Sequence, residues 1–293
     1  MSDYLVKAIT NGVRVYAAVT TDLVNEAIRR HDCYPVASAA LGRTMTGALL
    51  MAANLKNNEA ITVSFRGDGP LGTVTADASA EGYVRGYVGD PHVDLPLNAQ
   101  GKLDVGGGIG QGLVTITRFT GLREPVSGSC EIVTGEVAED LTQYLYVSEQ
   151  TPSCVGLGVL VGNDLKSIAA GGFIIQPMPD ATDEVISKLE ENLKNLRPVT
   201  SMIKDGLSPH GIIEEIMAGF EMEHLSTTEL KFKCQCSRQR IEDMLIALNV
   251  HDLEELVADG KAEICCHFCG EKYNFNKEEL EHILKIVQGV QKQ

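Results

Sequence analysis

Two pairs of cysteines near the end of the chain constrain most strongly what this sequence can fold into. The first pair is Cys234 and Cys236, and the second is Cys266 and Cys269, which Gly270 follows directly. Zn²⁺ favours tetrahedral ligation by thiolates, and each short loop can supply two of the four corners. Cys-x-x-Cys-Gly is a knuckle spacing in which the glycine permits a tight turn around the metal. We therefore predict one Zn²⁺ ion bound by Cys234, Cys236, Cys266 and Cys269.

Other ligands and another chemistry stay open at this point. Cys265 directly precedes the second pair, although Cys-x3-Cys fits a knuckle less well, and His267 lies inside the knuckle. Cys-x-Cys is tighter than a typical ribbon knuckle, and two thiols this close can also oxidise to a disulfide. Cys33, Cys130 and Cys154 stand alone, and single thiols are more often small core residues than nucleophiles.

Length and composition describe a globular protein. The chain has 293 residues, 44% of them hydrophobic, which is enough for a domain with a large core and a smaller appendage. No apolar run reaches the length of a membrane span, and the N-terminus lacks the basic and apolar regions of a signal peptide. Thiols arranged for a metal suit a reducing compartment. We therefore expect a cytoplasmic protein with no membrane partner.

Nucleic acid and nucleotides are poor candidates as ligands. The net charge of −15 argues against phosphate binding, which needs a surplus of Lys and Arg. Gly67–Gly72 matches a dinucleotide fingerprint, but Pro70 lacks an N–H and a strand-like sequence follows, so we predict a hairpin turn. Gly106–Gly110 lacks the Lys-Ser/Thr of a P-loop, and we predict a flexible turn there.

Residues 1–179 are predicted to form an α+β domain with a mostly antiparallel sheet. Short alternating or apolar runs are separated by hairpin sequences such as Gly-Asp-Gly-Pro and Gly-Asn-Asp, and this pattern favours α+β over a doubly wound parallel sheet. Helices are expected at 22–30, 36–55 and 137–148, and strands at 61–66, 71–76, 83–88, 113–117, 129–133, 155–161 and 167–175.

Residues 180–229 are predicted to form a helical linker. Ser208 and Pro209 suit the start of a helix, and eleven acidic side chains face only four basic ones. Short helices are marginal alone, so this segment is either a solvated linker or one poised to unfold. Gly206→Ala is expected to stabilise it. One apolar stripe at helical spacing is formed by Val185, Leu189, Leu193 and Leu196.

Residues 230–293 are predicted to form a small zinc-binding module. Helices are expected at 238–248, 252–257 and 277–287, and Asn276 with Glu279 forms a capping-box-like start for the last. A module of this size has too little core for strong stability, and zinc binding would supply folding free energy.

The cysteine pattern, with twenty-nine residues between the pairs, resembles that of the redox-regulated heat-shock chaperones called the 33 kDa chaperonin family. The likeness covers essentially the whole chain. Further motifs that carry it are Arg29–His31 leading to Ala40–Thr44, Gly67–Gly72, Val84–Val88, Ser148–Gln150 and Ala170–Gln176.

The resemblance implies an ATP-independent holdase and not an enzyme. In such proteins the reduced, zinc-loaded form is inactive. Oxidation joins near neighbours, here Cys234 with Cys236 and Cys266 with Cys269, and releases zinc. The C-terminal module and the linker then unfold, the exposed surface binds unfolding client proteins, and activation favours a homodimer.

Two other classes of protein compete with this interpretation. A zinc-ribbon nucleic-acid module would show salt-sensitive binding to RNA or DNA, which the net charge of −15 disfavours. A thiol-disulfide oxidoreductase could use Cys-x-x-Cys, but it would need a thioredoxin-like βαβ setting around Cys266 and would turn over in an insulin-reduction assay.

Overall fold

The structure is a computed structural model that describes residues 2–56, 58–121 and 124–290. The chain divides into two compact units, Met1–Lys233 and Cys234–Gln293. Within the described ranges, none of the helices combines the length and the apolar character that crossing a lipid bilayer demands.

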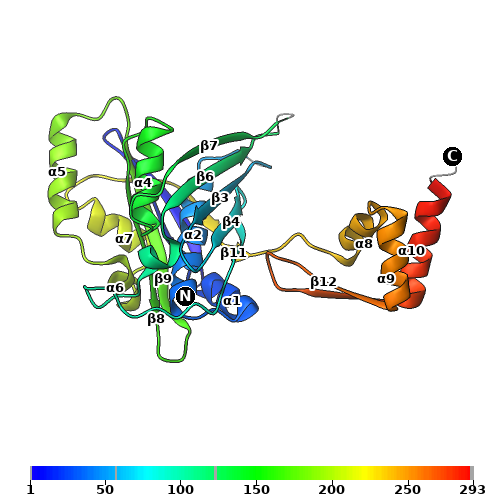
Figure 1. Cartoon of the computed structure of the whole chain (residues 1–293). Helices are drawn as coiled ribbons and strands as arrows, with labels where there is room; N and C mark the ends of the chain where they lie inside the picture. Colours follow the sequence, from blue (N-terminus) through cyan, green and yellow to red (C-terminus); the bar gives the residue numbers. More distant parts are fainter. Residues whose placement is uncertain (1, 57, 122–123, 291–293) are drawn as a thin grey trace. The chain divides into compact units, whose positions relative to one another are not determined.

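Two sheets form the framework of the first unit (Figure 1). Sheet A has the strand order β10-β1-β2-β9-β8, and every neighbouring pair is antiparallel. Sheet B has the order β11-β5-β4-β3-β6-β7 and is antiparallel except where β11 joins β5. The strands of sheet A are β1 (Tyr4–Thr10), β2 (Val13–Val19), β8 (Cys154–Val161), β9 (Ser167–Pro177) and β10 (Glu223–Glu229). Those of sheet B are β3 (Ala60–Gly67), β4 (Thr73–Ser79), β5 (Tyr83–Val88), β6 (Gly112–Phe119), β7 (Val126–Glu131) and β11 (Lys231–Phe232).

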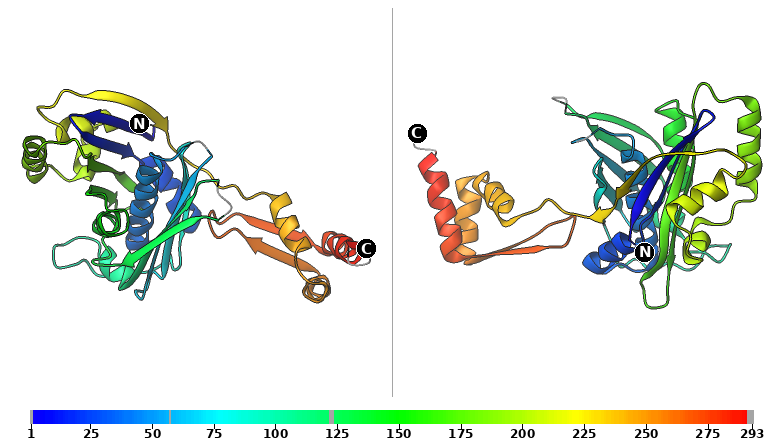
Figure 2. Two further views of the ribbon diagram at one scale, coloured as in Figure 1. Left: turned by 90° about the horizontal axis from the view of Figure 1, so that it is seen from above. Right: turned by 180° about the vertical axis from the view of Figure 1, so that it is seen from behind.

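Helix α2 (Pro35–Ala52) runs between the two sheets, as Figures 1 and 2 show. Sixteen of its 18 residues are buried, so its sequence is apolar on every side, as a helix inside a core must be. Its glycines let neighbours approach closely, because a Cβ on Gly47 would lie 2.5 Å from a methyl of Leu141. Shorter helices accompany it, namely α1 (Thr21–His31), α3 (Val105–Ile109) and α4 (Ala138–Val147).

The other face of sheet A is covered by α5 (Asp183–Lys194), α6 (Val199–Lys204) and α7 (Pro209–Ile216). Their buried residues form a second core with the strands beneath. The expected helix start is confirmed, because Ser208 accepts a hydrogen bond from the N–H of Gly211 and Pro209 is the first helical residue. The predicted linker is not helical throughout, since its last residues form β10, which pairs with β1. The buried set on these helices is Leu189, Val199, Met202, Ile203, Ile212, Ile213 and Ile216.

The two glycine-rich segments behave differently from each other. Gly67–Gly72 links the antiparallel strands β3 and β4, so the predicted hairpin turn is confirmed. The flexible turn expected at Gly106–Gly110 is wrong, because 105–109 form α3, capped by the side chain of Asp104. A Cβ at Gly108 would lie 2.8 Å from Leu71, so small residues are required there for packing.

Over residues 234–290, the second unit combines a hairpin with three helices. Strand β12 (Lys261–Cys265) pairs with β13 (Lys272–Asn276). Around it lie α8 (Arg238–Ile246), α9 (Val250–Asp259) and α10 (Lys277–Val290). The capping box is confirmed, because the N–H of Glu279 donates to Asn276 at 3.0 Å and the N–H of Asn276 donates to Glu279 at 2.9 Å. The unit has its own small core, of which the buried members are Ile241, Leu245, Leu253, Ala262, Phe275, Leu280, Ile283 and Val287.

The predicted fold class is therefore confirmed: helices and mainly antiparallel sheets form an α+β first unit, and the paired cysteines lie in a small C-terminal unit.

Candidate metal centre

The second cysteine pair lies in the turn between β12 and β13. The N–H of Cys266 donates to the carbonyl of Glu271 at 2.9 Å, and the N–H of Gly270 donates back to the carbonyl of Cys266 at 2.8 Å. Gly270 has φ of 69°, a left-handed conformation that glycine adopts without steric cost. These bonds fold the loop so that Cys266 and Cys269 present their sulfurs to the same point.

The first pair lies just before α8. Ser237 caps this helix by accepting a hydrogen bond from the N–H of Arg240 at 3.3 Å. The guanidinium of Arg240 donates to the carbonyl of Gln235, between the two cysteines, at 3.0 Å. The helix therefore fixes the backbone of the Cys-x-Cys loop.

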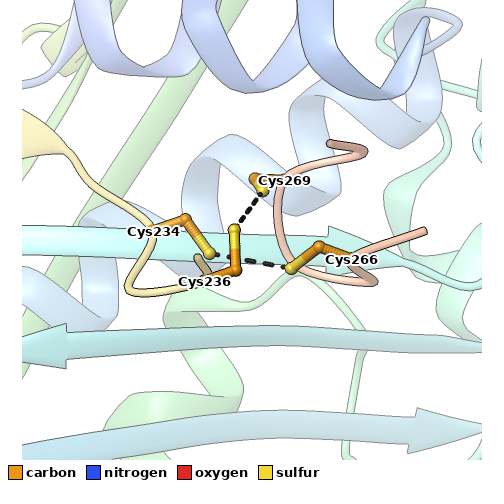
Figure 3. Close-up of side chains that lie close together, drawn as sticks. All are labelled: Cys234, Cys236, Cys266 and Cys269. Atoms are coloured by element: carbon orange, nitrogen blue, oxygen red, sulfur yellow. Dashed lines mark hydrogen bonds between the residues drawn. The ribbon is translucent and has the colours of Figure 1, made fainter. Parts of the chain in front are cut away.

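The four cysteine sulfurs converge, as Figure 3 shows. The Sγ atoms of Cys234 and Cys266 are 3.7 Å apart, and those of Cys236 and Cys269 are 3.3 Å apart. All four lie within 4.8 Å of one another. A tetrahedron with Zn–S bonds of about 2.3 Å has edges of about 3.8 Å, so the cluster is of the size that one ion needs. None of the cysteines forms a disulfide, and this donor set could hold one metal ion.

The surroundings of the cluster favour a bound cation. Burial raises the pKa of the Cys269 thiol and of the Cys236 thiol, and a metal ion offsets such a penalty by supplying positive charge next to the thiolates. The hydroxyl of Tyr273 donates to the sulfur of Cys236 at 3.2 Å. Such a bond orients a metal ligand from outside its first coordination shell.

The two other candidate ligands stand apart. Cys265, the last residue of β12, is exposed, and neither it nor His267 belongs to the cluster of metal-binding side chains found among the described residues. The three single cysteines lie in the first unit. Cys33 is buried, in line with a core role, and Cys130 and Cys154 are half-buried.

The sequence places Tyr273 at the end of the knuckle motif, but it did not predict the contacts by which Tyr273 and Arg238 support the cluster. The hydrogen bond from Tyr273 could have been anticipated from its place three residues after Gly270, on the strand that leaves the knuckle. Arg238 gave no signal, yet its guanidinium lies 4.4 Å from the centre of the Phe275 ring and pairs with Glu279 at 2.7 Å. It thus connects the start of α8 with β13 and α10.

Comparison with known proteins gives a consistent result. The family described as Hsp33 protein matches residues 3–276. The chain is 50% identical to a 33 kDa chaperonin of Bacillus subtilis, over 95% of this chain and 97% of the relative. It is 47% identical to a 33 kDa chaperonin of Desulforamulus reducens, over 98% of this chain and 99% of the relative.

A solved structure agrees over the whole fold. The crystal structure of a 33 kDa chaperonin from Thermotoga maritima superposes with a TM-score of 0.91 at 36% sequence identity, covering 98% of this chain and 99% of that one. These relatives are named as chaperonins and not as enzymes. The matched length, the identities and the shared fold show that the chain belongs to the Hsp33 family of 33 kDa heat-shock chaperones.

Proposed function

We propose that this protein is a redox-regulated, ATP-independent holdase that is inactive while reduced and zinc-bound. The convergence of four thiols on one point is the observation that carries the proposal. Zinc is the metal we assign to Cys234, Cys236, Cys266 and Cys269, because four sulfurs in tetrahedral spacing are a structural zinc site. When bound, zinc would hold the thiols as thiolates, the form that oxidants attack.

Oxidation would turn the metal ligands into two disulfides. One molecule of peroxide oxidises a thiolate to a sulfenic acid, which a second thiol then attacks to form a disulfide and water. Two molecules of peroxide thus consume all four thiols. A disulfide sulfur is a far poorer zinc ligand than a thiolate, so the metal leaves as Zn²⁺.

We assign the disulfides to Cys234–Cys236 and Cys266–Cys269. In the reduced cluster the Sγ atoms of Cys234 and Cys266 lie 3.7 Å apart and those of Cys236 and Cys269 lie 3.3 Å apart, but both distances suit metal ligation rather than a disulfide bond of about 2.05 Å. Once zinc no longer clamps the two loops, closure of a very short chain segment costs less entropy than closure of a long one. Local pairing therefore prevails over pairing between the loops.

Loss of zinc would unfold the second unit. Its core consists of a few apolar side chains on three short helices and a two-stranded hairpin. A structural zinc ion contributes about 10 kcal/mol or more to the folding of small metal-bound peptides. A core of this size cannot replace that contribution.

The segment 180–229 would follow as a metastable linker between the core domain 1–179 and the zinc module 230–293. Helices α5, α6 and α7 are short and would be marginal alone, and the apolar residues of the second core hold them on sheet A. Unfolding of this linker would expose those residues together with the apolar outer face of sheet A, on which Val13, Val15 and Phe173 are buried in the folded state. Large exposed apolar patches bind other proteins, and partly unfolded clients are the partners that fit.

The activated form would be a homodimer in the cytoplasm, with unfolding or oxidatively damaged proteins as clients. The direct experiment compares reduced and peroxide-treated protein at mild heat for suppression of client aggregation, measured by light scattering without ATP. Suppression only after oxidation, reversed by dithiothreitol with added Zn²⁺, supports the proposal. Equal suppression by both forms rejects redox control.

A further inference from the structure

A cavity of about 710 Å³ opens in the first unit, far along the sequence from the cysteine cluster. Its floor is formed by strands β1, β2 and β9 of sheet A. Its walls are the last turn of α2 with the residues that follow it, the end of β6, and the segment after α4. Cavities of this size are typical of sites for small organic ligands.

The strand register brings the polar floor residues together. Lys7 pairs with Tyr16 across β1 and β2, and Ile9 pairs with Arg14. On the other side of β2, Arg14 pairs with Gln176 of β9. Residues directly opposite each other in neighbouring strands point to the same face of a sheet, so two cations and an amide share one face and line the cavity.

Both floor cations lack a carboxylate partner among the described residues. Arg118 in the wall pairs with Glu149, but no such ion pair involves Lys7 or Arg14, although the chain has 40 Asp and Glu. Arg14 donates to a neutral acceptor, the Met178 sulfur, at 3.7 Å. Burial and the nearby Arg14 lower the pKa of Lys7. Half-buried charges are normally paired, so this arrangement suits a cavity that receives an anion.

The rest of the lining has a polar part and a larger apolar part, and the apolar part is suited to an apolar group of a ligand. Two wall atoms, Nε of Arg118 and Oγ1 of Thr120, are buried and have no hydrogen-bond partner among the described residues, so hydrogen bonding in the polar part of the wall is also incomplete there. The apolar side chains that line the cavity are Ile9, Leu50, Met51, Leu55, Leu145 and Ile174.

We propose that this cavity binds a small amphiphilic anion, with its anionic head on Lys7 and Arg14 and its apolar tail against Leu50, Leu145 and Ile174. The site is independent of the cysteine cluster and of its oxidation. Ligand binding requires only the folded first unit, so this proposal can fail without affecting the proposed redox switch, and the reverse is also true.

Three probes separate the parts of such a ligand: octanoate has head and tail, acetate only the head, and 1-octanol only the tail. Calorimetric titration of the reduced, zinc-loaded full-length protein should show one saturable octanoate site per chain. Acetate and 1-octanol should each bind about tenfold or more weakly, because each lacks one set of contacts. Absence of saturable octanoate binding, or equal affinity for octanoate and 1-octanol, overturns the proposal without any variant.

Two variants test the head contacts. Arg14→Gln and Lys7→Gln should each weaken octanoate binding by about tenfold or more, the usual effect of losing a charge-assisted hydrogen bond, and should leave 1-octanol binding unchanged. Lys102→Gln is the matched control, because it removes the same charge from an exposed residue outside the cavity. Thermal melts verify that each variant is folded. If Arg14→Gln does not fold, Lys7→Gln alone tests the head contacts. Octanoate affinity unchanged in a folded variant overturns the assignment of the head site.

Discussion

The sulfurs of Cys234 and Cys266 lie 3.7 Å apart, although 32 positions of sequence separate the two residues. This pair joins the loop before α8 to the turn of the β12–β13 hairpin, and Cys236 with Cys269 does the same at 3.3 Å. The four thiols thus lie at the point where the two loops of the second unit come together. A change in the chemical state of these thiols acts directly on how the unit is held together.

Replacement of Cys266 by Ser should abolish stoichiometric zinc binding, because three sulfurs and a distant hydroxyl cannot complete the tetrahedron. Cys265→Ser is the matched control, since it changes the adjacent exposed thiol outside the cluster. Zinc measured by atomic absorption should fall well below one ion per chain in the first variant and stay at one in the second. The opposite pattern would assign the ligand to Cys265.

Tyr273→Phe should weaken zinc binding by roughly 10- to 100-fold, the usual effect of removing a hydrogen bond to a metal ligand. The hydroxyl of Tyr273 donates to the sulfur of Cys236, and phenylalanine keeps the ring without the donor. Competition with a chromogenic chelator measures the affinity. Tyr146→Phe, which changes a tyrosine that is 64% exposed in the first unit, serves as control. An unchanged affinity in Tyr273→Phe would mean that this bond does not support the site.

Peptide mapping after peroxide treatment should find Cys234 linked to Cys236 and Cys266 linked to Cys269. The physical reason is the short chain between the members of each pair once the metal has left. The protein should be alkylated under denaturing conditions before digestion, so that no exchange follows. A majority of Cys234–Cys266 and Cys236–Cys269 links would show instead that the reduced geometry dictates the pairing.

The stability of the linker should set the oxidant dose needed for activation. Gly211 lies inside α7, and a Cβ there would make ordinary contact with Leu207 at 3.4 Å. Gly211→Ala should therefore stabilise the linker by about 0.5–1 kcal/mol and raise the peroxide dose or temperature at half-maximal holdase activity.

Gly206 provides the opposite case. The expectation that Gly206→Ala stabilises the linker is wrong, because Gly206 follows α6 with φ of 92°, a conformation in which alanine is strained. This variant should lower the dose needed. Hydrogen exchange over residues 180–229 reports linker opening directly. If both variants respond to oxidant as the wild type does, the linker is a passive spacer.

The sequence correctly predicted the features that are determined by interactions between neighbouring residues. The cysteine spacing, the Asn276–Glu279 capping box, the Ser208 helix start and the Gly67–Gly72 hairpin each depend on a few adjacent residues. By contrast, the pairing of β10 with β1 joins Glu229 to Tyr4, and no local pattern encodes a contact between such distant positions. The prediction of a flexible turn at Gly106–Gly110 was wrong because the helix at this site depends on the Asp104 cap and on packing against Leu71.

The central claim is that zinc release and client binding are two results of one event. It is tested most directly in a single oxidant titration, in which a chelator dye reports released zinc and light scattering reports suppression of client aggregation in the same samples. The account predicts that one Zn²⁺ per chain is released and that both curves share a midpoint. Cys266→Ser controls, which lack bound metal from the start, should release no zinc and should suppress client aggregation already without oxidant. Full holdase activity in samples that retain their zinc would contradict it.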